Sequence, residues 1–202
     1  MRTRRWIGLL AVVAMVALTI AMNRVETETR ITGGTPTQRT MAIWAVGRFT
    51  AGELDLPSLE VRFHEDRTGC DGRSGLYRNG VADLCGVHVN WMSRRAVLHE
   101  MAHSWVEANV SADLEARFLR LRQLETWDDH AVEWEARGTE HAAEIISWAL
   151  DGQPTGIRQA SIPRNEPDQL AAAYELLTGH PLPDCPCRQT LGSLSVRRPT
   201  VG

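Results

Sequence analysis

Apolar residues along this 202-residue chain recur at two different spacings, and each spacing predicts its own kind of element. Spacings of three and four residues, typical of helices with one buried face, run through five segments. Strict alternation of apolar and polar residues, typical of a half-buried strand, marks "SLEVRFH" at 58–64. The helical segments are approximately 38–51, 94–109, 112–124, 140–151 and 167–178.

A β-hairpin is predicted between "GLYR" and "VADLCGVHV", because the Asn79-Gly80 pair that separates them is a favoured two-residue turn. The chain therefore combines a few strands with a larger number of helices. The expected fold class is α+β, with a small antiparallel sheet packed on helices and the helix after Ser93 at the centre.

The ends of the helices are marked by residues that suit caps. Ser93, Ser111 and Thr139 are the expected N-caps, because their hydroxyl groups can accept from backbone N–H groups of the first turn. Gly152 and Gly179 are expected to end the last two helices, since glycine readily adopts the left-handed conformation found there. The helix after Ser111 should bury a stripe made of Leu114, Phe118, Leu121 and Leu124.

Composition divides the chain into four parts. Residues 1–23 hold three arginines followed by an uncharged apolar run at 7–22, which suits a signal peptide or a signal-anchor that leaves the remainder outside the cytoplasm. A buried core helix is the alternative interpretation of this run. Residues 24–37 are expected to form a polar linker, 38–187 one globular domain, and 188–202 a disordered tail.

The charge of the chain excludes one class of partner. The formal net charge is −3, so the chain has no surplus of lysine and arginine with which to neutralise phosphates. Nucleic acid is therefore not expected as a partner. A membrane is expected as one, through the apolar run near the N-terminus.

Four cysteines fit a protein of an oxidising compartment. They allow three pairings, and the interpretation favoured here joins Cys70 to Cys85 across the predicted hairpin. Cys185 and Cys187 are one residue apart, and their pairing stays open. With His180 they could instead bind a second zinc ion, although their spacing matches no usual structural zinc pattern.

The candidate chemistry lies in "AVLHEMAHSW", within the predicted helix at 94–109. His99 and His103 are four residues apart, so both imidazoles lie on one face of the helix, one turn from each other. Glu100 lies beside the first of them. This H-E-x-x-H spacing predicts two zinc ligands and a carboxylate that acts on water at the metal.

A catalytic zinc site usually takes three protein ligands, so a third must come from elsewhere in the chain. The extended motif that supplies a third histidine locally is excluded, because "HEMAHSWVEAN" lacks its glycine and its last histidine. His130 and His141 are available. Glu140 and Glu144 are a better source, because at a spacing of four both carboxylates lie on one helix face. One could bind the metal while the other accepts the free N–H of a ligating imidazole.

"HEMAH" followed by "EHAAE" resembles the gluzincin zinc metallopeptidases, and the short chain is most similar to the compact minigluzincins. The resemblance implies that zinc is the cofactor, with Glu100 as the general base. Glu144 would orient a ligand from outside the coordination sphere. The zinc ligands that the resemblance implies are His99, His103 and Glu140.

The same resemblance implies that the strand just before the helix, at about 84–89, is the sheet edge where a substrate peptide pairs. The expected activity is zinc-dependent hydrolysis of peptide bonds in a peptide or protein substrate outside the cytoplasm. The alternatives are a non-catalytic extracytoplasmic binding module that keeps zinc for stability, and an interaction domain without metal. A donor that stabilises the oxyanion is also needed. The candidates are His130, Arg137, His141, Tyr174 and His180.

Overall fold

The computed structural model describes residues 28–88, 91–152 and 160–183. Within these ranges the chain forms four strands, five helices and two short 3-10 turns. The strands are β1 (Thr29–Gly33), β2 (Leu59–His64), β3 (Gly75–Arg78) and β4 (Val81–Cys85). The helices are α2 (Pro36–Ala51), α3 (Trp91–Asn109), α4 (Ala112–Arg122), α5 (Gly138–Asp151) and α6 (Pro167–Thr178), and the 3-10 turns are η1 (Thr68–Cys70) and η2 (Trp134–Ala136).

The strands form one mixed sheet in the order β1-β2-β4-β3. β2 pairs in parallel with both β1 and β4, and only β3 and β4 are antiparallel. The α+β class is confirmed, but the expected antiparallel sheet is wrong, since the sheet is mostly parallel. For β1 and β2 the physical reason is the connection through α2, because a parallel pair needs a long crossover and a helix supplies it.

β1 lies inside the segment that was expected to be a polar linker, 24–37. Its five residues, "TRITG", hold β-branched Thr29, Ile31 and Thr32, and Ile31 packs against the core. β-branched residues fit a pleated, half-buried surface. The expectation of a linker is therefore wrong for these residues, which form an edge strand of the sheet.

α2 begins two residues earlier than expected. Thr35 caps it by accepting from the Gln38 backbone N–H at 3.3 Å, while the Thr35 backbone donates to the Gln38 side chain at 2.7 Å. Pro36 occupies the first turn, where its missing N–H costs nothing. The same Gln38 side chain donates to the Val87 carbonyl at 2.7 Å, which ties α2 to the segment that leads into α3.

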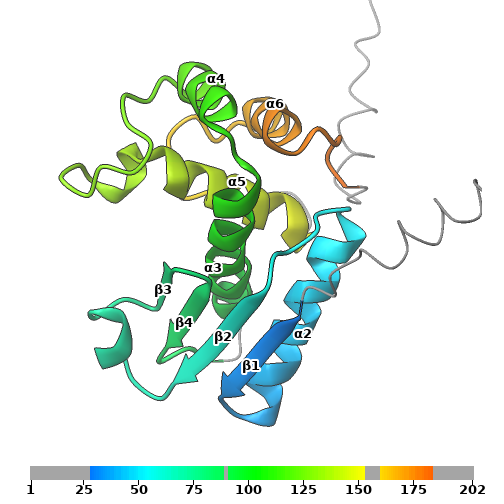
Figure 1. Cartoon of the computed structure of the whole chain (residues 1–202), viewed down its shortest axis with the longest axis vertical. Helices are drawn as coiled ribbons and strands as arrows, with labels where there is room; N and C mark the ends of the chain where they lie inside the picture. Colours follow the sequence, from blue (N-terminus) through cyan, green and yellow to red (C-terminus); the bar gives the residue numbers. More distant parts are fainter. Residues whose placement is uncertain (1–27, 89–90, 153–159, 184–202) are drawn as a thin grey trace, which may run out of the picture.

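α3 is the central helix of the fold, as expected. In Figure 1 the strands fill the lower part of the molecule and α4, α5 and α6 lie in the upper part, with α3 running between them. α3 packs most extensively against α5. Its residues from Val97 to Met101 are buried on both the sheet side and the α5 side. A helix that is covered on several sides can be apolar around most of its circumference.

The expected caps are confirmed at three of five helix ends. Ser111 accepts from the Leu114 N–H at 3.3 Å, and Gly152 and Gly179 end α5 and α6 with φ of 64° and 73°. α3 instead begins before Ser93. α5 begins at Gly138 rather than after Thr139, because backbone bonds from the preceding loop hold its first turn.

The expected buried stripe of α4 is confirmed only at Phe118, since Leu114 and Leu124 are half-buried. Phe118 is fully buried, whereas Leu121 is 43% exposed. The next residue, Arg122, is buried in its place. The side chain of Arg122 reaches backbone carbonyls of a later loop, an arrangement that apolar spacing does not report.

The predicted disulfide between Cys70 and Cys85 is present, and both residues are fully buried. It joins η1 to the end of β4 and brackets the β3–β4 hairpin, whose turn at Asn79 and Gly80 has positive φ at both positions, as predicted. A disulfide is typical of proteins that fold in an oxidising compartment outside the cytoplasm.

Three expectations fall on parts of the chain that lie outside the described residues. These are the apolar run at 7–22, the tail at 188–202, and the pairing of Cys185 and Cys187. Among the helices that the structure does describe, none has the length and apolar character needed to cross a membrane.

Candidate metal centre

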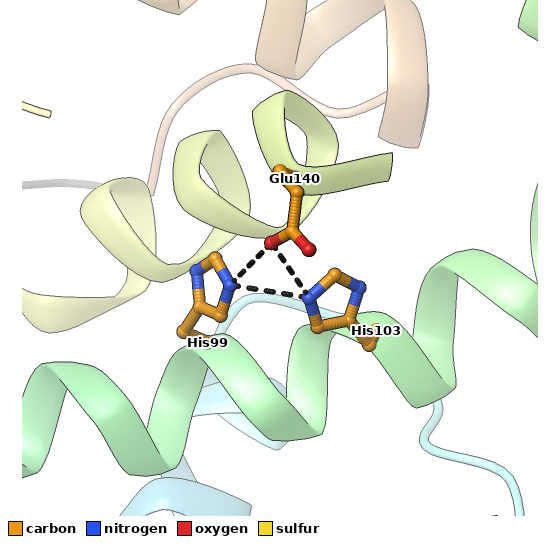
Figure 2. Close-up of side chains that lie close together, drawn as sticks. All are labelled: His99, His103 and Glu140. Carbon is orange, nitrogen blue, oxygen red and sulfur yellow. Dashed lines mark hydrogen bonds and ion pairs between the residues drawn. The ribbon is translucent and has the colours of Figure 1, made fainter. Parts of the chain in front are cut away.

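Two helices bring the predicted metal ligands together. His99 and His103 lie one turn apart on α3, and Glu140 lies in the first turn of α5, which packs against α3. Figure 2 shows the two imidazoles and the carboxylate pointing toward one another across the gap between the helices. These three residues, called the metal cluster below, could hold a metal ion.

The distances within the metal cluster fit zinc. Nε2 of His99 and Nε2 of His103 are 3.1 Å apart, and Oε2 of Glu140 lies 3.0 Å and 3.2 Å from them. A tetrahedral zinc site with bonds of about 2.0–2.1 Å places neighbouring ligand atoms roughly 3.3 Å apart. Two imidazoles and one carboxylate are also a donor set of catalytic zinc sites. The residues present therefore fit the implied metal in both chemistry and spacing.

The electrostatic environment of the metal cluster favours a bound positive charge. Burial alone would raise the pKa of the Glu140 carboxyl, but its hydrogen bonds with His103 and His99 outweigh burial and hold that pKa well below its usual range. Burial alone would lower the pKa of the His103 imidazole, but its contact with Glu140 outweighs burial and raises the pKa. The Glu140 carboxylate thus stays ionised beside the two imidazole nitrogens.

Glu144 contacts the metal cluster from behind. Its Oε2 lies 3.3 Å from Nδ1 of His99, the ring nitrogen that points away from Glu140. Its other oxygen, Oε1, accepts from the Ser161 backbone N–H at 2.7 Å and forms an ion pair with Arg95. Glu144 is 2% exposed, so these partners replace the water that the carboxylate loses.

Glu100 lies next to the metal cluster without joining it. It is 8% exposed, and burial raises the pKa of its carboxyl against the opposing effect of His99 and His103. A carboxyl with a raised pKa is a better proton acceptor near neutral pH than an ordinary one. Glu100 also lines the same cavity as the metal cluster.

The cavity has a volume of about 650 Å³ and lies between β3, α3, the loop before α5, and the first turn of α5. Aromatic rings flank the metal cluster inside it. The Tyr77 ring stacks on His103 with centroids 6.1 Å apart, and the Trp134 ring lies 5.8 Å from that of His99. The cavity therefore has room for a bound molecule beside the metal cluster.

The edge of the sheet beside the cavity is β3, which corrects the expectation that the strand at 84–89 is the edge. β4 is paired on both sides, with β2 and with β3. Because the Cys85 N–H donates to the Ser74 carbonyl at 2.9 Å, the alternation of an antiparallel ladder turns the backbone N–H and C=O groups of Gly75 and Tyr77 away from β4. These groups form the open edge on the cavity side.

The five candidates for the oxyanion donor separate into two groups. His130 and Arg137 line the cavity, and they contact each other through Nδ1 and Nη1 at 3.1 Å. The three other candidates, His141, Tyr174 and His180, are not among the residues that line it.

Three residues of the site were missed by sequence reasoning. Arg95 gives a detectable signal, because it stands four residues before His99 and so shares its helix face. Tyr77 could have been found from the hairpin, since two-residue alternation places it on the same face as Gly75. Trp134 gives no such signal, because the loop that carries it has no periodic pattern.

Comparisons of the chain with family models, with curated proteins and with solved structures give no match. What the structure itself provides is a cluster of His99, His103 and Glu140 on two packed helices of an α+β fold, an arrangement consistent with a zinc site.

Proposed function

We propose that this protein is a zinc-dependent peptidase that acts outside the cytoplasm. The observation that carries the proposal is the convergence of three ligand atoms, from His99, His103 and Glu140, at mutual distances of 3.0–3.2 Å beside a cavity. The buried carboxylate of Glu100 in the same cavity supplies the acid–base group that hydrolysis needs.

The three residues of the metal cluster would hold the zinc ion. When bound, zinc supplies Lewis acidity toward water and toward the carbonyl oxygen of the substrate. With zinc bound, Glu144 would accept a hydrogen bond from Nδ1–H of His99, which lies 3.3 Å away, and this would leave the lone pair on Nε2 for the metal. Arg95 and the Ser161 backbone hold Glu144 in place.

Glu100 would move the proton in the reaction. Its carboxylate takes a proton from the attacking water as the oxygen forms a bond to the carbonyl carbon. It then gives that proton to the amine nitrogen as the carbon–nitrogen bond breaks. The raised pKa of Glu100 suits both steps, because the group must accept and then release a proton near neutral pH. Arg137 and His130 are the candidate donors to the oxyanion.

β3 would receive the substrate peptide by strand addition, since the outward backbone groups of Gly75 and Tyr77 line the cavity next to Glu100. This mode suits peptides and unfolded protein segments. The disulfide between Cys70 and Cys85 supports action in an oxidising compartment. Attachment to a membrane through residues 7–22 is part of the same proposal, and nucleic acid is not a partner in it.

The test combines metal analysis with cleavage of a mixed peptide library. The purified protein should contain one zinc ion per chain and should cleave peptides. Glu100→Gln should keep the zinc and lower cleavage by at least about a hundredfold, since one positioned acid–base group contributes roughly 10²–10⁴-fold. Glu175→Gln, the same change at an exposed position of α6, is the matched control and should retain full activity.

Each outcome distinguishes between the candidate functions. Bound zinc without any cleavage would favour a binding module that uses zinc for stability. Cleavage that survives Glu100→Gln would contradict the role given to Glu100. Purified protein that takes up no zinc would contradict the proposal as a whole.

A further inference from the structure

Gly75, the first residue of β3, faces Glu100 across the wall of the cavity. A β-carbon built on Gly75 would lie 2.3 Å from Oε1 of Glu100 and 2.7 Å from both Cδ and Cγ. Carbon atoms that are not bonded to each other are optimally about 3.5–4.0 Å apart. The Glu100 side chain therefore occupies the volume that any other residue at position 75 would need.

Glycine at this position matters for space rather than for backbone conformation, since a β-carbon could be accommodated only if the Glu100 side chain moved. Gly80 in the same hairpin is the opposite case, because its φ is 78° and a β-carbon there would meet nothing closer than 3.9 Å. Gly75 is not among the glycines with positive φ. A glycine inside a strand commonly marks the close approach of another group, and here that group is a carboxylate.

We propose that Gly75 is a positioning residue for Glu100. The inference rests on the proposed role of Glu100 as general base. Without a side chain at position 75, the Glu100 carboxylate lies directly against the backbone of β3. The backbone of Gly75 also belongs to the open edge that would hold the substrate peptide. One residue thereby sets the distance between the base and the peptide that it acts on.

The consequence for catalysis follows from the geometry of proton transfer. A base must lie within hydrogen-bond reach of the proton that it takes, and a displacement of about 1 Å can cost roughly a hundredfold in rate. A methyl group at position 75 would push the Glu100 carboxylate off the strand. It would leave the metal cluster in place, because His99, His103 and Glu140 are held by α3 and α5.

The test is a thermal double-mutant cycle between Gly75→Ala and Glu100→Ala, measured on the full chain. Gly75→Ala alone should lower the unfolding midpoint by about 3–10 °C, since overpacking a well-packed site is destabilising. In the Glu100→Ala background, where the three atoms nearest the new methyl group are gone, the same substitution should lower the midpoint by less than about 2 °C.

Gly47→Ala is the matched control. Gly47 is exposed within α2, and a β-carbon there meets nothing within 4 Å, so the midpoint should be unchanged or raised by about 1–3 °C. Equal losses for Gly75→Ala in both backgrounds would overturn the proposal. If Gly75→Ala alone does not fold, folding of the double variant supports the proposal, and failure of the double variant overturns it.

A second readout uses the activity. Gly75→Ala should keep one zinc per chain and lower kcat by about 10–100-fold, with a smaller change in KM. Unchanged kcat in this variant would overturn the proposal. The thermal cycle needs neither zinc nor a substrate. If the wild-type protein cleaves no peptide, the proposed function fails while the cycle still decides whether Gly75 positions Glu100.

Discussion

Two neighbouring residues of α5, Glu140 and His141, belong to polar clusters of opposite kinds. Glu140 faces the cavity together with the two histidines of α3. His141 faces the interior, where its Nε2 lies 2.8 Å from the Glu135 carbonyl oxygen and Arg122 donates to its Nδ1 at 3.3 Å. His141, Arg122 and the Glu135 carbonyl are called the interior cluster below.

The histidines of the two clusters also differ in the direction of their pKa shifts. Burial, helped by the nearby charge of Arg122 and opposed by the bond to the Glu135 carbonyl, lowers the pKa of the His141 imidazole to about 4. In the metal cluster, the contact with Glu140 raises the pKa of His103. A buried histidine is therefore kept neutral beside a guanidinium and favours positive charge beside a carboxylate.

The difference teaches that residue type alone does not make a metal site. Both ring nitrogens of His141 already have partners within the protein, so this histidine has no lone pair to offer to an ion. The nitrogens of the metal cluster instead face one another and a carboxylate at the wall of a cavity. What separates a structural histidine from a ligand is the direction of its unshared electron pair.

The largest effect is expected when one histidine is deleted from each cluster and the zinc affinities of the two variants are compared. His103→Ala should weaken zinc binding by more than the roughly 10–100-fold that loss of an outer partner costs, because it removes a ligand. His141→Ala should keep zinc affinity within about tenfold and lower stability instead. Competition with a chromophoric chelator measures both affinities. Loss of zinc in His141→Ala together with retention in His103→Ala would reverse the assignment of the two clusters.

A second prediction concerns the contribution of the interior cluster to the stability of the fold. Arg122 is 2% exposed and also donates to the Pro163 and Arg164 carbonyls, so Arg122→Met removes the donor to the buried His141 ring and to two loop carbonyls. The expected cost is about 2–4 kcal/mol in the free energy of unfolding, measured by urea denaturation. Arg117→Met, the same change at an exposed position of α4, should cost less than about 0.5 kcal/mol. Equal costs for the two variants would contradict a structural role for the interior cluster.

The smallest of these effects concerns the partner behind His99. Glu144→Gln keeps the shape of the side chain but removes the charge that attracts Nδ1–H of His99 and pairs with Arg95. Zinc affinity should fall by roughly 10–100-fold, as it does when the hydrogen-bond acceptor of a ligating histidine is lost. Glu175→Gln serves as the control in the same chelator assay. An unchanged affinity in Glu144→Gln would mean that α3 alone orients His99.

The metal cluster was the most predictable part of the molecule. His99 and His103 follow from helical spacing, which is a local property of the chain, and the same spacing on another predicted helix indicates the pair of Glu140 and Glu144. The contact of Glu144 with His99 agrees with its expected place, while its role stays a prediction. Two features depend on how the elements pack, which local spacing does not report: which of the two glutamates joins the histidines, and the contact of Tyr77 with His103.

The sheet was less predictable than the helices. β1 is short, and Ile31 is its only large apolar residue, so "TRITG" resembles a linker until β2 lies beside it. Parallel pairing was missed because the pairing partner of a strand is set by residues far away in the sequence. The only local signal is the turn at Asn79 and Gly80, and it indicates an antiparallel pair. Both errors arise where tertiary contacts decide the structure.

The bond between Cys70 and Cys85 has a consequence for how this protein can change over evolution. It closes the chain into a ring that contains the whole of β3, while the metal ligands lie outside that ring on α3 and α5. The crosslink confines insertions at the base of the ring, whereas Gly75 and Tyr77 within the ring contact Glu100 and His103 of α3. The peptide preference can therefore change through insertions within the ring, provided that position 75 keeps its glycine.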